Sequence, residues 1–146
     1  MTGSTRRVAV VTGGAAGIGA AICRFLARDG ADIAIWDRNA EAARGVARDI
    51  AAMGRRAVVC EVDVSRRHHI ESAVKAVRAE LGPIGILVNN AAISPEKDFV
   101  DITDEDWDTV FDINMKGVFM CTQAVIGDMI AAQWGRIINI SSSSAQ

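Results

Sequence analysis

The chain reads Thr12-Gly13-Gly14-Ala15-Ala16-Gly17-Ile18-Gly19 directly after an apolar run at residues 8–11. A helical pattern follows, and we expect its apolar face to consist of Ile18, Ala21, Ile22, Phe25 and Leu26. The start of such a helix favours anions, because its first N–H groups are unpaired and carry the positive end of the dipole. Since glycines let backbone approach a phosphate closely, the order strand, glycine loop, helix predicts a pyrophosphate site. A glycine-rich turn that only joins a strand to a helix is the alternative.

Apolar strands alternate with amphipathic helices along the rest of the chain. We expect strands at residues 7–12, 32–36, 57–62, 84–89 and 136–140. We expect helices at residues 17–29 and 40–53, a third helix that Ser65 caps and Gly82 ends, and a long helix to residue 132. Thr103 to Asp106 is typical of a capping box that opens the long helix.

Near-continuous apolar strands separated by helices imply a parallel sheet that is covered on both faces. Right-handed crossovers then favour a doubly wound, Rossmann-like α/β sheet with the strand order 3-2-1-4-5. This fold usually has six strands, so we expect the sheet to be incomplete on the C-terminal side. No linker separates a second domain, and residues 1–146 are expected to form one domain.

Polar residues follow the predicted strands at the edge where parallel α/β sheets bind ligands. Asp37 lies twenty residues after Gly17, where an acid can accept the hydroxyls of an adenosine ribose and repels a 2′-phosphate. This position favours NAD over NADP, although the neighbouring Arg38 could pair with a 2′-phosphate. Alternatively, Asp37 caps the next turn. Asn89-Asn90 could border a ligand, satisfy backbone groups where the strand opens, or do both.

Two further polar residues are candidates for chemistry. Asn114 shares an inward-facing helical stripe with Trp107, Val110, Phe111, Val118, Cys121 and Val125. An unpaired buried amide costs about 1–3 kcal/mol, so we expect Asn114 to have a polar partner, in the core or in an active site. Ser142 follows the last strand at the carboxyl edge. His68 and His69 are expected to be solvated and away from that edge.

Composition excludes some classes of function. The net charge of −2 gives no electrostatic reason to expect nucleic acid or an anionic membrane as a partner. No apolar run is long enough to span a bilayer. The three cysteines, Cys23, Cys60 and Cys121, have no motif spacing, which predicts buried reduced thiols, a cytoplasmic location and no metal site.

The chain resembles the short-chain dehydrogenase/reductase family over essentially its whole length. The matching motifs occur in the family's order and spacing, and they are Thr12-Gly13-x-x-x-Gly17-Ile18-Gly19, Asp37, Asp63-Val64, Asn89-Asn90-Ala91, Asn114 and residues 135–142. The resemblance implies an NAD(P)-dependent enzyme that transfers hydride between an alcohol and a ketone or aldehyde. A small alcohol or carbonyl compound, such as a 3-oxoacyl thioester, is the implied substrate, and intact members are expected to form homo-oligomers.

The resemblance also implies a role for each matched residue. The cofactor loop would comprise Thr12, Gly13, Ala15, Gly17, Ile18 and Gly19, with the pyrophosphate on its glycines. Asp37 would bind the adenosine ribose, Asp63 and Val64 would flank the adenine, and Asn90 and Ala91 would border the cofactor. Without the resemblance, Asp63 would be read as a helix-entry residue. In the active site, Asn114 would hold a relay water and Ser142 would polarise the reacting oxygen.

The family's acid/base pair, Tyr-x-x-x-Lys, has no match in this sequence. The chain has no tyrosine, and Lys75, Lys97 and Lys116 all lie upstream of the serine. General acid/base catalysis contributes about 10²–10⁴-fold in rate, so we expect a trace of activity at best. The chain would then be the first part of a longer enzyme, which Asn114 and Ser142 favour, or a truncated product. A non-catalytic dinucleotide-binding module is the alternative function.

Overall fold

The computed structural model describes residues 7–142 and contains a five-stranded sheet in that range. All neighbouring strands pair in parallel, in the order β3-β2-β1-β4-β5. The strands are β1 (Val8–Thr12), β2 (Asp32–Asp37), β3 (Ala57–Glu61), β4 (Ile84–Asn89) and β5 (Arg136–Asn139). The predicted fold class and strand order are confirmed.

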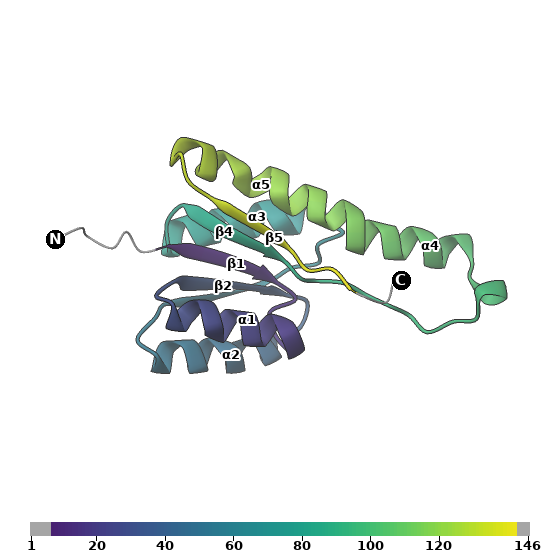
Figure 1. The fold of residues 1–146 in the computed structure, drawn as a ribbon, viewed down its shortest axis with the longest axis horizontal. Helices are drawn as coiled ribbons and strands as arrows, with labels where there is room; N and C mark the ends of the chain where they lie inside the picture. The colour runs from purple at the N-terminus through teal and green to yellow at the C-terminus, as the bar shows by residue number, and fades with distance from the viewer. Residues whose placement is uncertain (1–6, 143–146) are drawn as a thin grey trace.

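Helices cover the two faces of the sheet, as Figure 1 shows. On one face lie α1 (Gly17–Arg28) and α2 (Ala40–Ala52), and on the other lie α3 (Arg67–Glu80) and α5 (Gly117–Ala131). A short 3₁₀ turn, η1 (Phe99–Asp101), precedes α4 (Asp104–Phe111). One π-helical segment, η2 (Asp112–Lys116), joins α4 to α5.

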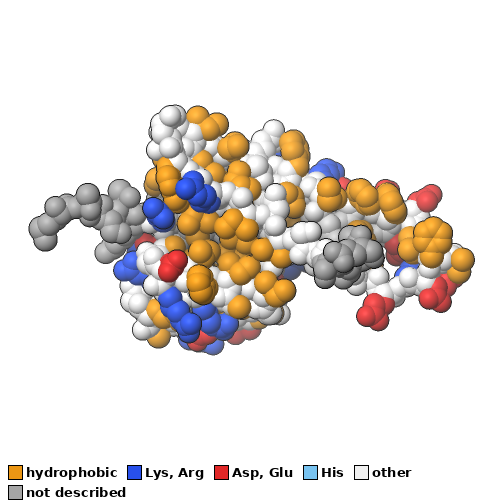
Figure 2. Space-filling model, viewed as in Figure 1, with side chains coloured by type: hydrophobic (Ala, Val, Ile, Leu, Met, Phe, Trp, Pro, Cys, Tyr) orange, Lys and Arg blue, Asp and Glu red, His pale blue; other side chains and the backbone are white. Residues whose placement is uncertain are grey.

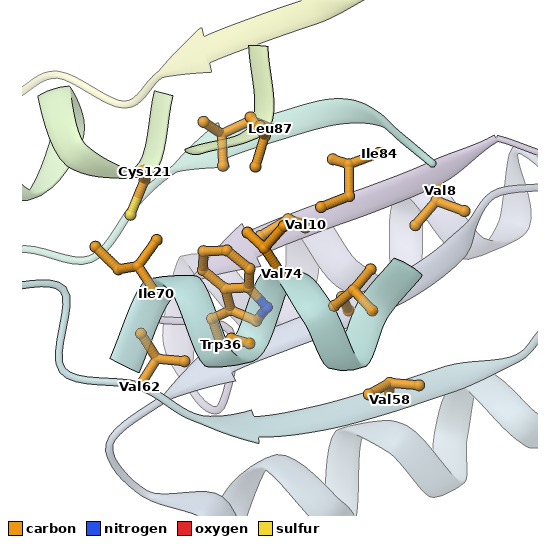
Figure 3. Close-up of a cluster of buried hydrophobic side chains, with 14 of the residues drawn as sticks. Val8, Val10, Trp36, Val58, Val62, Ile70, Val74, Ile84, Leu87 and Cys121 are labelled. Carbon is orange, nitrogen blue, oxygen red and sulfur yellow. The ribbon is translucent and has the colours of Figure 1, made fainter. Parts of the chain in front are cut away.

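Alternation along the strands divides the core into two layers, because successive side chains point to opposite faces. Ile33 and Ile35 pack under α1 and α2, whereas Ala34 and Trp36 pack under α3 and α5. In Figure 3, Trp36 lies among apolar side chains of β1, α3 and the β3–α3 connection. The strands β1, β2 and β4 are thus buried on both sides, which explains their near-continuous apolar sequence.

The predicted apolar face of α1 is wrong for Ile18, Ala21 and Phe25. The helix buries Gly19, Ala20, Cys23 and Ala27, whereas Ile18 and Phe25 are 66% and 65% exposed. The physical reason is close approach, since a Cβ on Gly19 would overlap the carbonyl oxygen of Gly13. Small side chains therefore face the sheet, and Ile22 and Leu26 of the predicted face pack partly buried against the core.

The long helix is continuous but does not bury the predicted stripe along its whole length. The capping box is confirmed: Asp106 N donates to Thr103 Oγ1, and Thr103 N donates to Asp106 Oδ2. However, α4 extends beyond the sheet (Figure 1), and Trp107 and Phe111 are exposed. Only the α5 part of the stripe, with Cys121 and Val125, lies in the core.

The sheet is open beyond β5, as predicted. All four residues of β5 are exposed, and Ile137 and Ile138 are about two-fifths accessible to solvent. Figure 2 shows apolar side chains gathered on the face between α1 and α5, where the sheet lacks a covering helix. Within residues 7–142, no helix is both long and apolar enough to cross a membrane.

Candidate functional site

The loop between β1 and α1 is shaped by glycines. Gly13 and Gly17 have φ angles of 65° and 51°, in the left-handed region that favours glycine. A Cβ on Gly17 would meet no atom within 4 Å, so this side of the loop is open. The first hydrogen bond of α1 runs from Ala20 N to Ala16 O, and the N–H groups of residues 17–19 precede it. These groups have no helical carbonyl to pair with and can bind an anion.

Hydrogen bonds fix this loop to the end of β4. Asn90 Nδ2 donates to Thr12 O at 3.0 Å and to Gly13 O at 3.1 Å. Thr12 Oγ1 accepts from Asn90 N and Ala91 N at 2.9 and 3.0 Å. The predicted role of the Asn89-Asn90 pair in satisfying backbone groups is therefore confirmed for Asn90. The carboxyl ends of β1 and β4 form one rigid wall beside the glycine loop.

Asp37 fastens the end of β2 to the same loop. Its Oδ2 accepts from Ala15 N at 2.9 Å, and its Oδ1 accepts from Asn39 N at 2.8 Å. The hydrogen bond from Asn39 N confirms the alternative prediction that Asp37 caps the turn after β2. A ribose hydroxyl bound there would share the carboxylate with these two amides.

Asp63 organises the connection between β3 and α3. Its Oδ1 accepts from Ser65 N at 2.9 Å and from Ser65 Oγ at 2.6 Å. Burial of this carboxyl opposes its ionisation, but the Ser65 hydrogen bonds and the charges of Arg38 and Arg66 hold the pKa of Asp63 below its usual value. Ser65 does not cap α3, contrary to prediction, because its hydroxyl is bonded to Asp63 and the N-cap position is Arg66.

The position predicted for His69 is wrong as well. A helix that follows a parallel strand begins at the carboxyl edge of the sheet, so the first turn of α3 lies beside the site. His69 is half-buried, and its Nδ1 accepts from Asp63 N at 3.2 Å. His68 is exposed, as expected.

A cavity of about 230 Å³ lies at this edge of the sheet. It brings together sequence-predicted residues from four connections, namely Gly13, Asp37, Asp63, Val64, Asn90 and Ala91. Arg38 also lines it. Thr12, Ala15, Gly17, Ile18 and Gly19 are not part of its lining. Thr12 and Ala15 contact lining residues through hydrogen bonds, and Gly19 packs against Gly13.

Asn114 and Ser142 line a second cavity of about 610 Å³. Asn114 has the polar partner that its position predicts: its Oδ1 accepts from Ile93 N at 2.9 Å, and its Nδ2 donates to Ile93 O at 2.8 Å. Trp107, Val110 and Phe111 form an apolar wall of the same cavity. The other residues of the terminal serine run, Ser143 and Ser144, lie outside the described residues.

The residues present fit a dinucleotide. The glycine loop leaves space where a side chain on Gly17 would stand, and a cavity at the same edge of the sheet is lined by Gly13, Asp37 and Asp63. Among residues 7–142, no group of three or more His, Cys, Asp or Glu side chains is arranged to hold a metal ion. A doubly wound sheet with such a loop at its first crossover defines a nucleotide-binding α/β protein.

The chain belongs to the short chain dehydrogenase family, whose model matches residues 7–146. It is 40% identical over 136 residues to the cyclopentanol dehydrogenase of Comamonas testosteroni, which covers 93% of this chain and 54% of that protein. It is 38% identical over 143 residues to the acetoacetyl-CoA reductase of Cupriavidus necator, with coverage of 97% and 58%. The chain therefore spans about half the length of these curated relatives.

Solved structures show the same fold. A metagenomic short-chain oxidoreductase in complex with NADP superposes with a TM-score of 0.87 at 38% identity, covering 93% of this chain and 62% of that one. Members of the family use NAD(P).

Sequence reasoning missed three features of the site. The Ala15–Asp37 and Asp63–His69 contacts join residues that only the crossover geometry brings together. The sequence around Asn114 does not distinguish the π-helical segment from an ordinary helix. The one indirect signal is the polar Asn114 on the apolar face of the helix, since π-turns often occur at functional positions.

Proposed function

We propose that residues 1–146 form the dinucleotide-binding domain of an NAD(P)-dependent oxidoreductase that acts on CH–OH groups. The observation that carries this proposal is the glycine loop, which is open at Gly17 and whose Gly13 lines one cavity together with Asp37 and Asp63. The bound nicotinamide would supply the hydride acceptor or donor for an alcohol–carbonyl conversion. The substrate would be a small alcohol or a ketone or aldehyde.

Each residue near the two cavities then has a physical task. The N–H groups of Gly17, Ile18 and Gly19 would bind the pyrophosphate, and Gly13 and Ala15 would hold the loop in shape. Asp37 would accept the ribose hydroxyls, and Asp63 and Val64 would border the adenine. Asn90 and Ala91 would form the wall behind the cofactor, and Thr12 would brace them.

In the second cavity, the Ser142 hydroxyl would orient the oxygen of the substrate by a hydrogen bond. The Asn114 side chain makes one hydrogen bond as donor and one as acceptor with the backbone of Ile93, so it fixes the Ala92–Ile93 wall of the cavity, and its remaining N–H and lone pair would hold a relay water. The apolar wall at Trp107 and Phe111 suits a hydrocarbon substrate skeleton. The named relatives act on cyclopentanol in one case and on an acyl-CoA in the other, which leaves a 3-oxoacyl thioester among the candidates.

NAD is the proposed cofactor, with NADP second. Asp37 would repel a 2′-phosphate, and this charge lies in the lining next to Arg38. Titration calorimetry of the chain with NADH and NADPH tests the preference, and we expect NADH to bind at least about tenfold more tightly, since one charge contact is worth about 1.5–3 kcal/mol. Asp37→Ser should reduce or reverse this ratio. Tighter binding of NADPH by the unchanged chain would contradict the assignment.

We propose that the 146-residue chain alone has at best a trace of turnover, because its sequence lacks the acid/base tyrosine of the family. An assay with NAD(H) and a panel of alcohols and ketones tests this. Turnover near that of an intact family member would refute the claim of catalytic incompleteness. The alternative, a non-catalytic dinucleotide-binding module, predicts binding without turnover even when the chain is produced within any longer reading frame.

The compartment and assembly are also proposals. Cys23, Cys60 and Cys121 are free, and burial raises the pKa of each thiol, to about 12 for Cys23 and Cys121 and about 11 for Cys60. Cys23 and Cys121 are buried and Cys60 is partly buried, and unreactive thiols of this kind support a reducing cytoplasmic location. For an intact enzyme we propose a homo-oligomer, and we propose neither a nucleic acid nor a membrane as a partner.

A further inference from the structure

The imidazole of His69 lies beside the site, where it bonds a residue that lines the 230 Å³ cavity. Its Nδ1 accepts the backbone N–H of Asp63, and the backbone N–H of His69 donates to Arg66 O within the first turn of α3. Asp63 N would otherwise be a partly buried donor at the end of β3. A single acceptor nitrogen thus ties the start of α3 to the wall of the 230 Å³ cavity.

The hydrogen bond between Asp63 N and His69 Nδ1 acts on a segment that lines the 230 Å³ cavity. Val62, Asp63 and Val64 all line the cavity, and both Val62 and Val64 are buried. On the other side, a Cβ on Gly117 would contact Val64, so this segment is packed from behind by the start of α5. The backbone of Asp63 is therefore the part of the wall whose position depends on His69.

An imidazole can accept at Nδ1 only while that nitrogen is unprotonated. Histidine side chains ordinarily change charge between about pH 5 and 8, and the imidazolium form has N–H groups at both nitrogens. Protonation of His69 would place two hydrogens, one on Nδ1 and one on Asp63 N, against each other. The hydrogen bond would then be lost.

From these contacts we propose that neutral His69 positions the Asp63–Val64 wall of the dinucleotide cavity, and that protonation of His69 weakens dinucleotide binding. The proposal rests on the proposed function, since it concerns the adenine side of that site. His69 acts through Asp63 and is a positioning residue.

Other titratable or charged groups lie around the Asp63–His69 hydrogen bond, and their charges also act on it. Asp63 and Arg66 form an ion pair at 3.5 Å in the same turn, and the His68 ring meets the His69 ring edge-on with centroids 4.4 Å apart. Arg38 acts on Asp63 from the end of β2. Across from α3, Gln123 of α5 accepts from Arg67, and Glu61 ends β3. A variant that changes His69 alone is needed to separate its effect from theirs.

The discriminating variant is His69→Asn, because the amide oxygen of asparagine can take the place of Nδ1 and does not titrate. NAD⁺ binding is measured by titration calorimetry at pH 8 and pH 5.5. We expect the dissociation constant of the unchanged chain to rise about three- to tenfold at the lower pH, the equivalent of one hydrogen bond. His69→Asn should change less than twofold, and His69→Ala should bind about three- to tenfold more weakly at both pH values.

The matched control is His68→Asn, which makes the same chemical change at the exposed neighbour and should keep the pH dependence of the unchanged chain. Far-UV circular dichroism identifies a variant that fails to fold, and His69→Asn remains informative if His69→Ala does so. Equal pH profiles for the unchanged chain and His69→Asn would overturn the proposal.

A second measurement needs no cofactor. The amide resonance of Asp63, followed by NMR from pH 8 to pH 5.5, should shift with pH in the unchanged chain and stay constant in His69→Asn. An Asp63 amide that behaves alike in both proteins would overturn the positioning role. If no variant binds NAD⁺ while the Asp63 amide still follows His69, the proposed function fails and the local contact stands.

Discussion

Gly19 has no side chain, and both the shape of the glycine loop and the proposed dinucleotide binding depend on this. A Cβ there would overlap Gly13 O and crowd Asn90 Nδ2, so Gly19→Ala must push α1 away from β1 or distort the loop. We expect at least a tenfold loss of NADH affinity and a lower free energy of unfolding, by about 1–3 kcal/mol as for other overpacked sites. Fluorescence titration and urea unfolding measure the two effects.

Gly127→Ala is the matched control for this substitution. Gly127 lies inside α5, and a Cβ there would meet nothing within 4 Å. This change should raise the free energy of unfolding by up to about 1 kcal/mol through helix propensity and leave NADH affinity unchanged. Equal NADH affinities for the two alanine variants would contradict the role given to the loop.

Asp32 is a buried carboxylate whose partner is Arg56. Arg56 Nε and Nη2 donate to its Oδ2 at 2.8 and 2.7 Å, and Arg56 N donates to its Oδ1 at 3.0 Å. Burial opposes ionisation, but the Arg56 contacts outweigh it and hold the pKa of Asp32 below its usual value. Because the folded pKa is the lower one, ionised Asp32 stabilises the fold above about pH 4, and this contribution is lost as the pH falls through the folded pKa.

Asp32→Asn should therefore lower the free energy of unfolding at pH 7, by about 1–3 kcal/mol, and lower it less at pH 3. Urea unfolding at both pH values checks this. Asp29→Asn, at the exposed end of α1, should have no such pH-dependent cost. A loss for Asp32→Asn that is the same at pH 3 and pH 7 would contradict the ionic account.

Among the elements, α4 is the helix whose stability depends most on the hydrogen bonds at its ends. None of its residues is buried, and its first turn is closed by the reciprocal Thr103–Asp106 bonds. The hydrogen bond from Lys97, together with those from the backbone and side chain of Thr103, lowers the pKa of Asp106 to about 2. Thr103→Ala should cost about 1 kcal/mol of local stability. Hydrogen exchange should speed up in residues 104–111 and stay unchanged in residues 119–131.

Thr109→Ala is the control within the same helix, since the Thr109 hydroxyl bonds back to Glu105 O and caps nothing. It should leave exchange in α4 unchanged or slow it slightly. Faster exchange along the whole of α5 in Thr103→Ala would show that α4 and α5 unfold as one unit, contrary to this account.

The sequence was sufficient to predict the elements because their signals are local. Strand composition, the glycine loop and the Thr103 cap each lie within a few residues. Which side of α1 faces the sheet is not local, because the approach of Gly19 to Gly13 selects small residues over Phe25. The exposure of Trp107 likewise depends on α4 reaching past the sheet, and the Asp63–His69 bond depends on the β3–α3 crossover.

At the scale of the whole molecule, the sheet ends at an exposed strand. Ile137 and Ile138 of β5 lie beside an uncovered part of the sheet, and an open apolar edge favours pairing with another strand. We expect the 146-residue chain to self-associate as its concentration rises, measured by sedimentation velocity. Ile138→Lys should reduce this association more than Ile130→Lys, which places the same charge at a more exposed position, on α5. A larger reduction by the α5 variant than by Ile138→Lys would show that the chains associate through their helices.

A crystal structure of the chain with NADH would show whether the glycine loop binds the dinucleotide. We expect the pyrophosphate to lie against the N–H groups of residues 17–19, with the adenosine in the cavity between Asp37 and Asp63. Electron density for the dinucleotide elsewhere, or an empty loop at a concentration that saturates binding in solution, would contradict this expectation.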